Sequence, residues 1–236
     1  MTKSLPLRHP VGMRVDVHRA VPVAFALAVA GLAEARLPAV HPGRSPWVYW
    51  AVGLVAAVVC FASLLARDGA RAAVAGRQGV AVGSSLLRSS SGGTARSWNT
   101  APTPGAGLRT AVVGPLVSLG IALVTALAAY LVDAAGLSEL TAETLAWLAA
   151  VNVLLAVGHL LPGTPLDGAR LLHAVVWRRT GDRSRATAVA GAAGRYVGWP
   201  LLLLGLAQVV FADDLGGLWL ALVGIFLVAT AEHRHT

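Results

Sequence analysis

The sequence is poor in charged residues and in cysteine, and each shortage narrows the possible classes of protein. Only 13% of the 236 residues are charged and 56% are hydrophobic, whereas about a quarter of the residues in a soluble domain are charged. Several apolar runs are long enough to cross a bilayer core, which takes about 20 residues of helix. A soluble enzyme is therefore excluded. The single cysteine, Cys60, excludes an intramolecular disulfide framework.

Acidic residues are also scarce, and the net charge is +8. Nucleic-acid binding would need a basic patch on a folded soluble face. The basic residues here, 18 of them arginine and one lysine, fall mostly in short segments between apolar runs. We therefore expect no nucleic-acid partner and a membrane lipid bilayer as the surroundings. We expect no cleavable signal peptide either, because residues 1–19 are polar and basic.

The length and flanking residues of the apolar runs predict six transmembrane helices. The expected fold class is thus an all-α polytopic membrane protein, a single membrane domain over residues 1–236. The expected spans are 20–38, 47–66, 111–132, 143–161, 196–212 and 215–231.

The distribution of charge orients these spans, because cytoplasmic loops of membrane proteins carry an excess of Lys and Arg. With both termini inside, the inside segments hold 17 basic residues against five acidic ones. The outside segments then hold two basic residues against six acidic ones. We therefore expect both termini to be cytoplasmic.

Two inside segments interrupt the pattern of spans. Residues 79–110 begin with the alternating Val80–Val82 and end at the turn-forming Pro102–Gly105, which predicts a short cytoplasmic strand and loop between the second and third spans. Disorder of Ser89–Thr94 is the alternative that its composition suggests. Residues 161–170 break an apolar helix with two prolines and carry an acid, and such a break at membrane depth typically marks a functional site.

This second segment carries a resemblance to a known family. Leu161–Gly168 reads Leu-Pro-Gly-Thr-Pro-Leu-Asp-Gly, which matches the L-P-x-x-P-L-D-G signature of the site-2 proteases, the intramembrane zinc metalloproteases. The chain is similar to the compact bacterial group of this family, which implies a multi-pass protein of the bacterial plasma membrane. PDZ or CBS domains occur in the family, and we expect neither here. Four further segments resemble the family: Val15–His18, Gly92–Arg96, Gly114–Ser118 and Trp177–Asp182.

The zinc-binding motif of the family is replaced in this chain. The resemblance implies an H-E-x-x-H sequence on the second span, whose two histidines bind zinc while the glutamate acts as general base. Alignment of the flanking residues places Arg67 and Arg71 at the two histidine positions and Asp68 at the glutamate position. Asp167 stands at the position of the third zinc ligand and is the only ligand position retained.

These replacements argue against a bound metal. A guanidinium offers only donors and stays protonated, so it has no lone pair for zinc. Without a metal-bound water, Asp68 at the general-base position has no proton of lowered pKa to remove, and we expect it to be inactive. We hypothesise that Arg67 or Arg71 pairs with Asp167 where zinc would lie. The alternative is that both arginines reach the cytoplasmic interface by snorkelling.

A rewired zinc site remains a further alternative, in which His159 and Asp167 join His18 or His173. A histidine near a helix end is more often a hydrogen-bonded structural residue. We therefore expect no cofactor. Zinc is expected only if the chain is an active metalloprotease with an altered metal site. The resemblance also implies residues that line the substrate cleft: His159, Pro162, Pro165, Gly92 and Gly93.

The function expected from these residues is that of a site-2 protease-like membrane protein without catalytic activity, a pseudoprotease. Its expected partners are a transmembrane client or an active paralogue. The alternative is an active intramembrane zinc metalloprotease with an altered metal site. A transporter has little support, because no inverted repeat is evident in the sequence.

Overall fold

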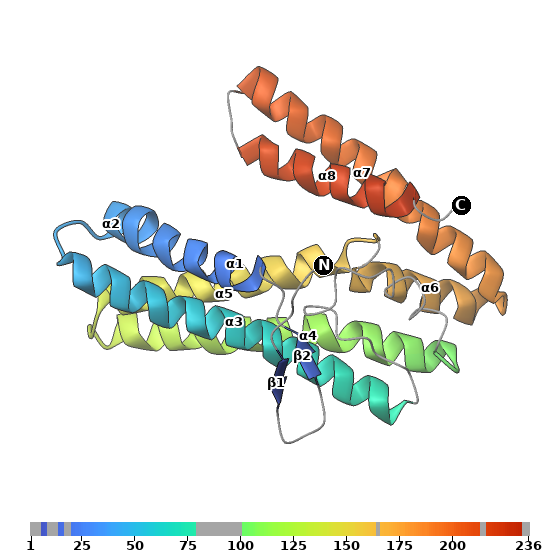
Figure 1. Cartoon of the computed structure of the whole chain (residues 1–236), viewed down its shortest axis with the longest axis horizontal. Helices are drawn as coiled ribbons and strands as arrows, with labels where there is room; N and C mark the ends of the chain where they lie inside the picture. The colour runs from blue at the N-terminus through green and yellow to red at the C-terminus, as the bar shows by residue number, and fades with distance from the viewer. Residues whose placement is uncertain are drawn as a thin grey trace. The chain divides into compact units, whose positions relative to one another are not determined.

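The computed structural model describes residues 6–8, 14–16, 20–78, 101–163, 166–212 and 216–232. Nearly all of this described chain is helical (Figure 1). Two strands precede the helices, β1 (Pro6–Arg8) and β2 (Arg14–Asp16). The helical elements are α1 (Ala20–Ala30), the π-helical segment η1 (Gly31–Arg36), α2 (Leu37–Val40), α3 (Pro46–Arg77), α4 (Pro104–Ala134), α5 (Glu139–Leu160), α6 (Asp167–Thr180), α7 (Arg183–Ala212) and α8 (Gly216–Glu232).

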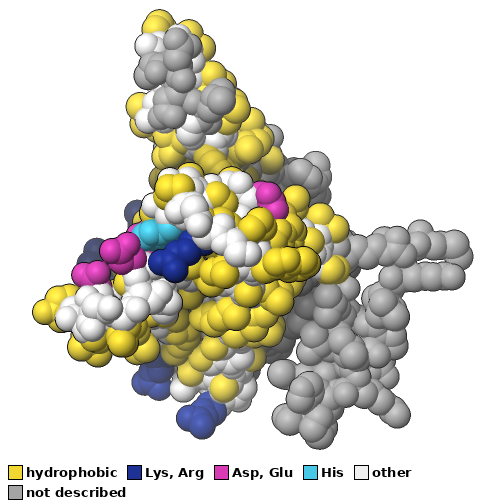
Figure 2. Space-filling model, turned by 90° about the vertical axis from the view of Figure 1, so that its left-hand side faces the viewer, with side chains coloured by type: hydrophobic (Ala, Val, Ile, Leu, Met, Phe, Trp, Pro, Cys, Tyr) yellow, Lys and Arg dark blue, Asp and Glu magenta, His cyan; other side chains and the backbone are white. Residues whose placement is uncertain are grey.

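Each of the six expected spans coincides with an apolar helix, and five of these helices are long enough to cross a membrane: 22–40, 46–77, 104–134, 139–160 and 183–211. The sixth, α8, has 17 residues and is shorter than the other five. Hydrophobic side chains dominate the face drawn in Figure 2, and large ones such as Leu123 and Leu154 are about 70% exposed, at 71% and 70%. Such a surface suits lipid, and the chain is a multi-pass membrane protein.

The structure differs from the sequence expectation at the helix ends and at the strands. α3 continues to Arg77 instead of ending near residue 66, because the residues that follow the apolar run are mainly alanine and arginine, which have high helix propensity. β1 and β2 form an antiparallel pair in which Leu7 lies opposite Val15, and these strands were not predicted from the sequence. The strand expected at Val80–Val82 lies outside the described residues.

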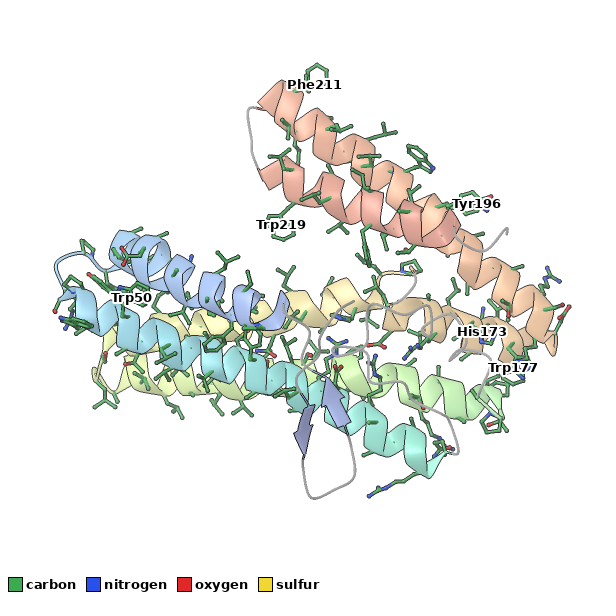
Figure 3. All side chains as sticks on the ribbon, in the orientation of Figure 1. Trp50, His173, Trp177, Tyr196, Phe211 and Trp219 are labelled. Carbon is green, nitrogen blue, oxygen red and sulfur yellow. The ribbon has the colours of Figure 1, made fainter. Side chains whose placement is uncertain are left out.

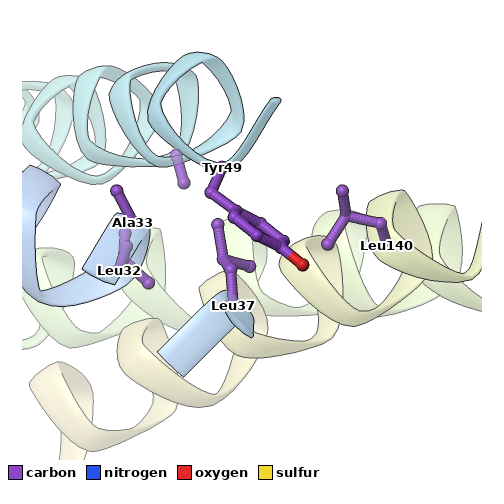
Figure 4. Packing of buried hydrophobic residues seen from close by; sticks show 6 residues of the cluster. Leu32, Ala33, Leu37, Tyr49 and Leu140 are labelled. Atoms are coloured by element: carbon purple, nitrogen blue, oxygen red, sulfur yellow. The ribbon is translucent and has the colours of Figure 1, made fainter. Parts of the chain in front are cut away.

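Packing divides the described chain into two compact units. The first contains β1, β2, α1, η1, α2, α3 up to residue 70, α4 from residue 116 and α5 up to residue 155. Its core is a cluster around Tyr49 (Figure 4). The Tyr49 hydroxyl donates a hydrogen bond to the carbonyl of His41 at 2.5 Å and accepts one from the N–H of Arg44 at 3.0 Å, which fixes the turn between α2 and α3. The buried members of the cluster are Leu32, Ala33, Leu37, Tyr49, Ala56 and Leu140.

The π-helical segment η1 has a physical cause in the sequence. Pro38 has no N–H, and its ring would clash with the carbonyl four residues earlier in a regular α-helix. In η1 the N–H of Leu37 donates instead to the carbonyl of Leu32, five residues back, so the backbone widens just before the proline. The helix therefore continues through residues 20–40 without a break.

The second unit contains α3 from residue 71, the first turns of α4, the end of α5, and α6, α7 and α8. Gly181 ends α6 in the left-handed conformation that favours glycine, with φ at 70°. α7 and α8 form an antiparallel hairpin (Figure 1). The two helices approach closely at glycines, because a Cβ built on Gly205 would overlap the backbone of Ala221 and one built on Gly224 would overlap the backbone of Leu202.

Candidate functional site

The second half of α3 carries the residues that align with the zinc-binding motif. Arg67 and Arg71 lie four residues apart on this helix, so both side chains lie on the same face. Both are buried, whereas Asp68 is partly exposed. Burial of two arginines is uncommon unless their charges are paired, and it does not favour snorkelling to the interface.

The signature segment ends in the first turn of α6. Leu166 precedes this helix with an extended backbone, at φ −71° and ψ 157°, and Asp167 is the first helical residue. A Cβ built on Gly168 would overlap the backbone carbonyls of Leu160 and Leu161. The start of α6 therefore lies directly against the end of α5, and only glycine fits at this position.

Gly163, at one of the variable positions of the signature, also lies in close contact with another helix. A Cβ built on Gly163 would overlap the side chain of Leu227 from α8, which is one of the largest fully buried side chains among the described residues. Packing alone thus explains Gly168 of the signature, without reference to catalysis.

Asp167 contacts an arginine of α3. Nη1 of Arg71 donates a hydrogen bond to Oδ1 of Asp167 at 2.6 Å, and the two side chains are 4% and 0% exposed. The structure thus contains the hypothesised pair, with Arg71 as the partner. Nη1 of Arg170, three residues along α6, lies 3.9 Å from the same oxygen. Sequence reasoning did not single out Arg170, although its spacing from Asp167 places both on one face of a helix.

The two described histidines of the alternative zinc site, His159 and His173, lie on different helices. His173 is buried, with its Nε2 atom 3.3 Å from Oγ1 of Thr187 on α7. Its ring packs against Trp177, with 5.9 Å between the centroids (Figure 3). His159 lies in the last turn of α5 and is partly exposed, and His18 lies outside the described residues.

The structure describes only part of the predicted substrate cleft. Pro162 follows the end of α5 and is partly exposed. Pro165, Gly92 and Gly93 lie outside the described residues. Within the described residues, no three side chains of His, Cys, Asp or Glu are grouped so that they could hold a metal ion.

The residues at this centre do not fit zinc. Zinc sites in proteins use sulfur, imidazole or carboxylate ligands, and a guanidinium supplies no lone pair. The carboxylates of Asp68 and Asp167 are ligand types that zinc accepts, but the Oδ1 atom of Asp167 already accepts a hydrogen bond from Arg71. The positive charge of Arg71 would also repel a dication bound to the neighbouring Asp167 carboxylate.

The chain is similar to known proteins of one family. The chain matches the sequence profile of peptidase family M50 over residues 46–204. It is 41% identical over 236 residues to Rip3 of Mycobacterium tuberculosis, whose name describes it as a zinc metalloprotease, and the match covers 100% of this chain and 60% of Rip3. It is 31% identical over 197 residues to sll0528 of Synechocystis, named in the same way, with 84% of this chain and 50% of that protein covered. The chain thus spans roughly half to three fifths of the length of these relatives.

A solved structure has the same fold. The site-2 protease from Methanocaldococcus jannaschii superposes with a TM-score of 0.56 and 21% sequence identity, covering 99% of this chain and 96% of that one. The family profile, the two relatives and this shared fold agree with the signature at Leu161–Gly168. The chain therefore belongs to the site-2 protease family, peptidase family M50.

Proposed function

We propose that this chain is a catalytically inactive member of the site-2 protease family, which binds or regulates transmembrane clients. One observation carries the proposal. The buried Arg71 guanidinium bonds to Asp167, the residue at the third ligand position, so a fixed side-chain cation lies where the family's signature implies a metal. Intramembrane proteolysis by this family depends on a metal-activated water, and the residues here supply neither its histidine ligands nor its glutamate base.

The balance of charges supports the idea that an arginine has replaced the metal, in preference to loss of the metal without a substitute. Zinc in the family's site offsets two carboxylates, the general base and the third ligand. An uncompensated carboxylate as deeply buried as Asp167 would be strongly destabilising. Arg71 provides the compensating charge through a short, charge-assisted hydrogen bond.

The first test is the zinc content of the purified full chain, measured by elemental analysis. We expect much less than one zinc per chain. One tightly held zinc per chain would overturn the proposal, and so would cleavage of a membrane substrate that Asp167→Ala abolishes.

The second test restores the motif with the triple variant Arg67→His, Asp68→Glu and Arg71→His. If the scaffold is otherwise competent, this variant gains zinc, and adding Asp167→Ala removes it again. A triple variant that folds and binds no zinc would show that the scaffold has lost more than its ligands, and would argue against a simple exchange of cations at this centre.

Client binding is tested by site-specific photo-crosslinking in the native membrane. A crosslinker in place of Pro162, in the predicted cleft, is expected to give a protein adduct. Leu123, an exposed residue of α4, provides the matched control on a lipid-facing helix. Adducts of equal yield at both positions would argue against a client-binding cleft.

A further inference from the structure

We propose that a cavity between α4, α5 and the turn after α2 binds a small organic cation with two or more ammonium groups, a diamine or polyamine. The cavity has a volume of about 480 Å³, which is in the usual range of small-molecule sites. All of its lining residues belong to the first compact unit, and none belongs to the centre around Asp167. The proposal is therefore independent of the proposed function.

The charged side chains that line this cavity are all acidic, with histidine counted as neutral. They are Asp133 near the end of α4, and Glu139 and Glu143 in the first turns of α5. Oε1 of Glu143 accepts a hydrogen bond from Nη2 of Arg36 at 2.5 Å. Within the part of the chain that the structure describes, the carboxylates of Asp133 and Glu139 form no hydrogen bond or ion pair. Two negative charges of the cavity are thus without a charged partner.

The position of Asp133 in α4 gives a reason for a cation to bind there. Asp133 is the second-last residue of this helix, and the carbonyl groups at the C-terminus of a helix disfavour a nearby negative charge. A bound cation offsets both the carboxylate and the negative end of the helix dipole. Walls that carry one sign of charge also raise the local concentration of a ligand of opposite charge.

His41 provides an observation that is independent of the carboxylates. It lines the same cavity, and its Nε2 atom is buried and has no hydrogen-bond partner among the described residues. Acidic side chains lie beside a histidine on the face drawn in Figure 2. A neutral imidazole with its proton on Nδ1 accepts a hydrogen bond at Nε2, and an ammonium group offers three donors. An ammonium group is therefore a chemical match for this atom.

The arrangement of the acidic groups favours an organic cation over a metal ion. In the described ranges, no three side chains of His, Cys, Asp or Glu are close enough together to hold one metal ion. The lining also includes the buried Ala129 and Ala142, and the ring of Tyr130, which is 67% exposed and available to a cation. A diamine has separate ammonium groups joined by methylene groups, so it matches separate carboxylates in a partly apolar lining.

The test titrates the purified full chain in uncharged detergent with putrescine, a diamine, and measures binding by calorimetry at constant ionic strength. We expect saturable binding of one putrescine per chain. Magnesium chloride is the second probe, because Mg²⁺ has the same charge as putrescine but no methylene groups. We expect Mg²⁺ to displace putrescine only at much higher concentration. Absence of saturable binding, or equal affinity for both probes, would overturn the proposal.

The deciding variants are Asp133→Asn and Glu139→Gln, each of which removes one carboxylate charge and keeps an oxygen acceptor. We expect each to weaken putrescine binding roughly threefold and the two together to weaken it roughly tenfold. Glu34→Gln is the matched control, because Glu34 is an exposed acid of the same unit outside the cavity lining. It should leave the affinity unchanged.

The unfolding temperature of each variant shows whether it is folded. Asp133→Asn is expected to fold, because it removes a charge that the end of α4 disfavours. A folded double variant that binds putrescine as tightly as the native protein would contradict the proposal. An equal loss of affinity in Glu34→Gln would also contradict it, because binding would then depend on the total charge and not on this cavity.

Discussion

At the scale of single residues, the pair of Arg71 and Asp167 joins side chains 96 positions apart in the sequence. Removing one member of a buried ion pair typically costs about 3–5 kcal/mol, because the remaining charge loses its nearest compensation. We therefore predict that Arg71→Met lowers the free energy of unfolding by about this amount, measured by unfolding in detergent.

The double variant Arg71→Met with Asp167→Asn removes both charges, and we expect it to recover part of this loss. Arg109→Met is the matched control, because Arg109 is exposed and its hydrogen bond to Gln78 is long, at 3.5 Å. If Arg71→Met were as mild as Arg109→Met, the pair would not contribute to stability.

Asp182 controls a different property, the pH dependence of stability. Its carboxylate accepts hydrogen bonds from the side chain of Ser184 at 2.7 Å and from the N–H of Arg185 at 3.0 Å. These bonds lower the pKa of Asp182 below its ordinary value, the Ser184 hydroxyl having the largest effect. A lowered pKa in the folded state stabilises the protein fully above the ordinary pKa of about 4, and this contribution is lost as the pH falls through the folded-state pKa.

We predict that Asp182→Asn, which keeps an oxygen acceptor and removes the charge, unfolds at a lower temperature than the native protein at pH 7. The two unfolding temperatures should converge as the pH falls well below 4, where the native carboxylate is protonated. A difference that stays constant from pH 7 to pH 3 would show that the charge does not matter.

The motif alignment led to Asp167 and to two candidate arginines, but could not choose between the arginines. The choice depends on how α6 lies against α3, which is a tertiary property. Arg170 was missed because an arginine near a helix start has no distinctive sequence signal. Burial of His173 was missed for a similar reason, since Thr187 belongs to another helix.

At the scale of elements, the hairpin of α7 and α8 depends on close contact between backbones, which glycine allows in membrane helices. We predict that Gly205→Ala destabilises the protein by about 1–3 kcal/mol, the usual cost of overpacking, because the added methyl would overlap the backbone of Ala221. Gly120→Ala adds the same methyl to α4, where nothing lies within 4 Å of the new atom. It should be neutral or stabilise slightly. Equal effects in thermal unfolding would contradict close packing of the hairpin.

Helix ends were predicted less well than helix positions, for a physical reason. Apolar runs report the part of a helix that faces lipid, so they located the six apolar helices of the described chain. They do not report where a helix leaves the membrane, and α7 begins at Arg183 instead of near residue 196. The polar turns at its start are held by Asp182 and by Arg183, whose guanidinium lies 4.9 Å from the ring centroid of Trp177.

At the scale of the whole molecule, the orientation in the membrane follows from charge and remains a prediction. The excess of basic residues in the predicted inside segments is large, so loss of one arginine does not change the predicted orientation. Single cysteine substitutions of arginines can therefore test the orientation. Suitable positions are Arg44, in the turn between α2 and α3, and Arg179, near the end of α6, and both are exposed. Each is changed to cysteine in a Cys60→Ser background, which removes the native thiol.

We predict that a membrane-impermeant thiol reagent added to intact cells labels Arg44→Cys and leaves Arg179→Cys unlabelled. Permeabilised cells should label both, which controls for the reactivity of each thiol. Labelling of Arg179→Cys in intact cells would place α6 outside and reverse the predicted orientation.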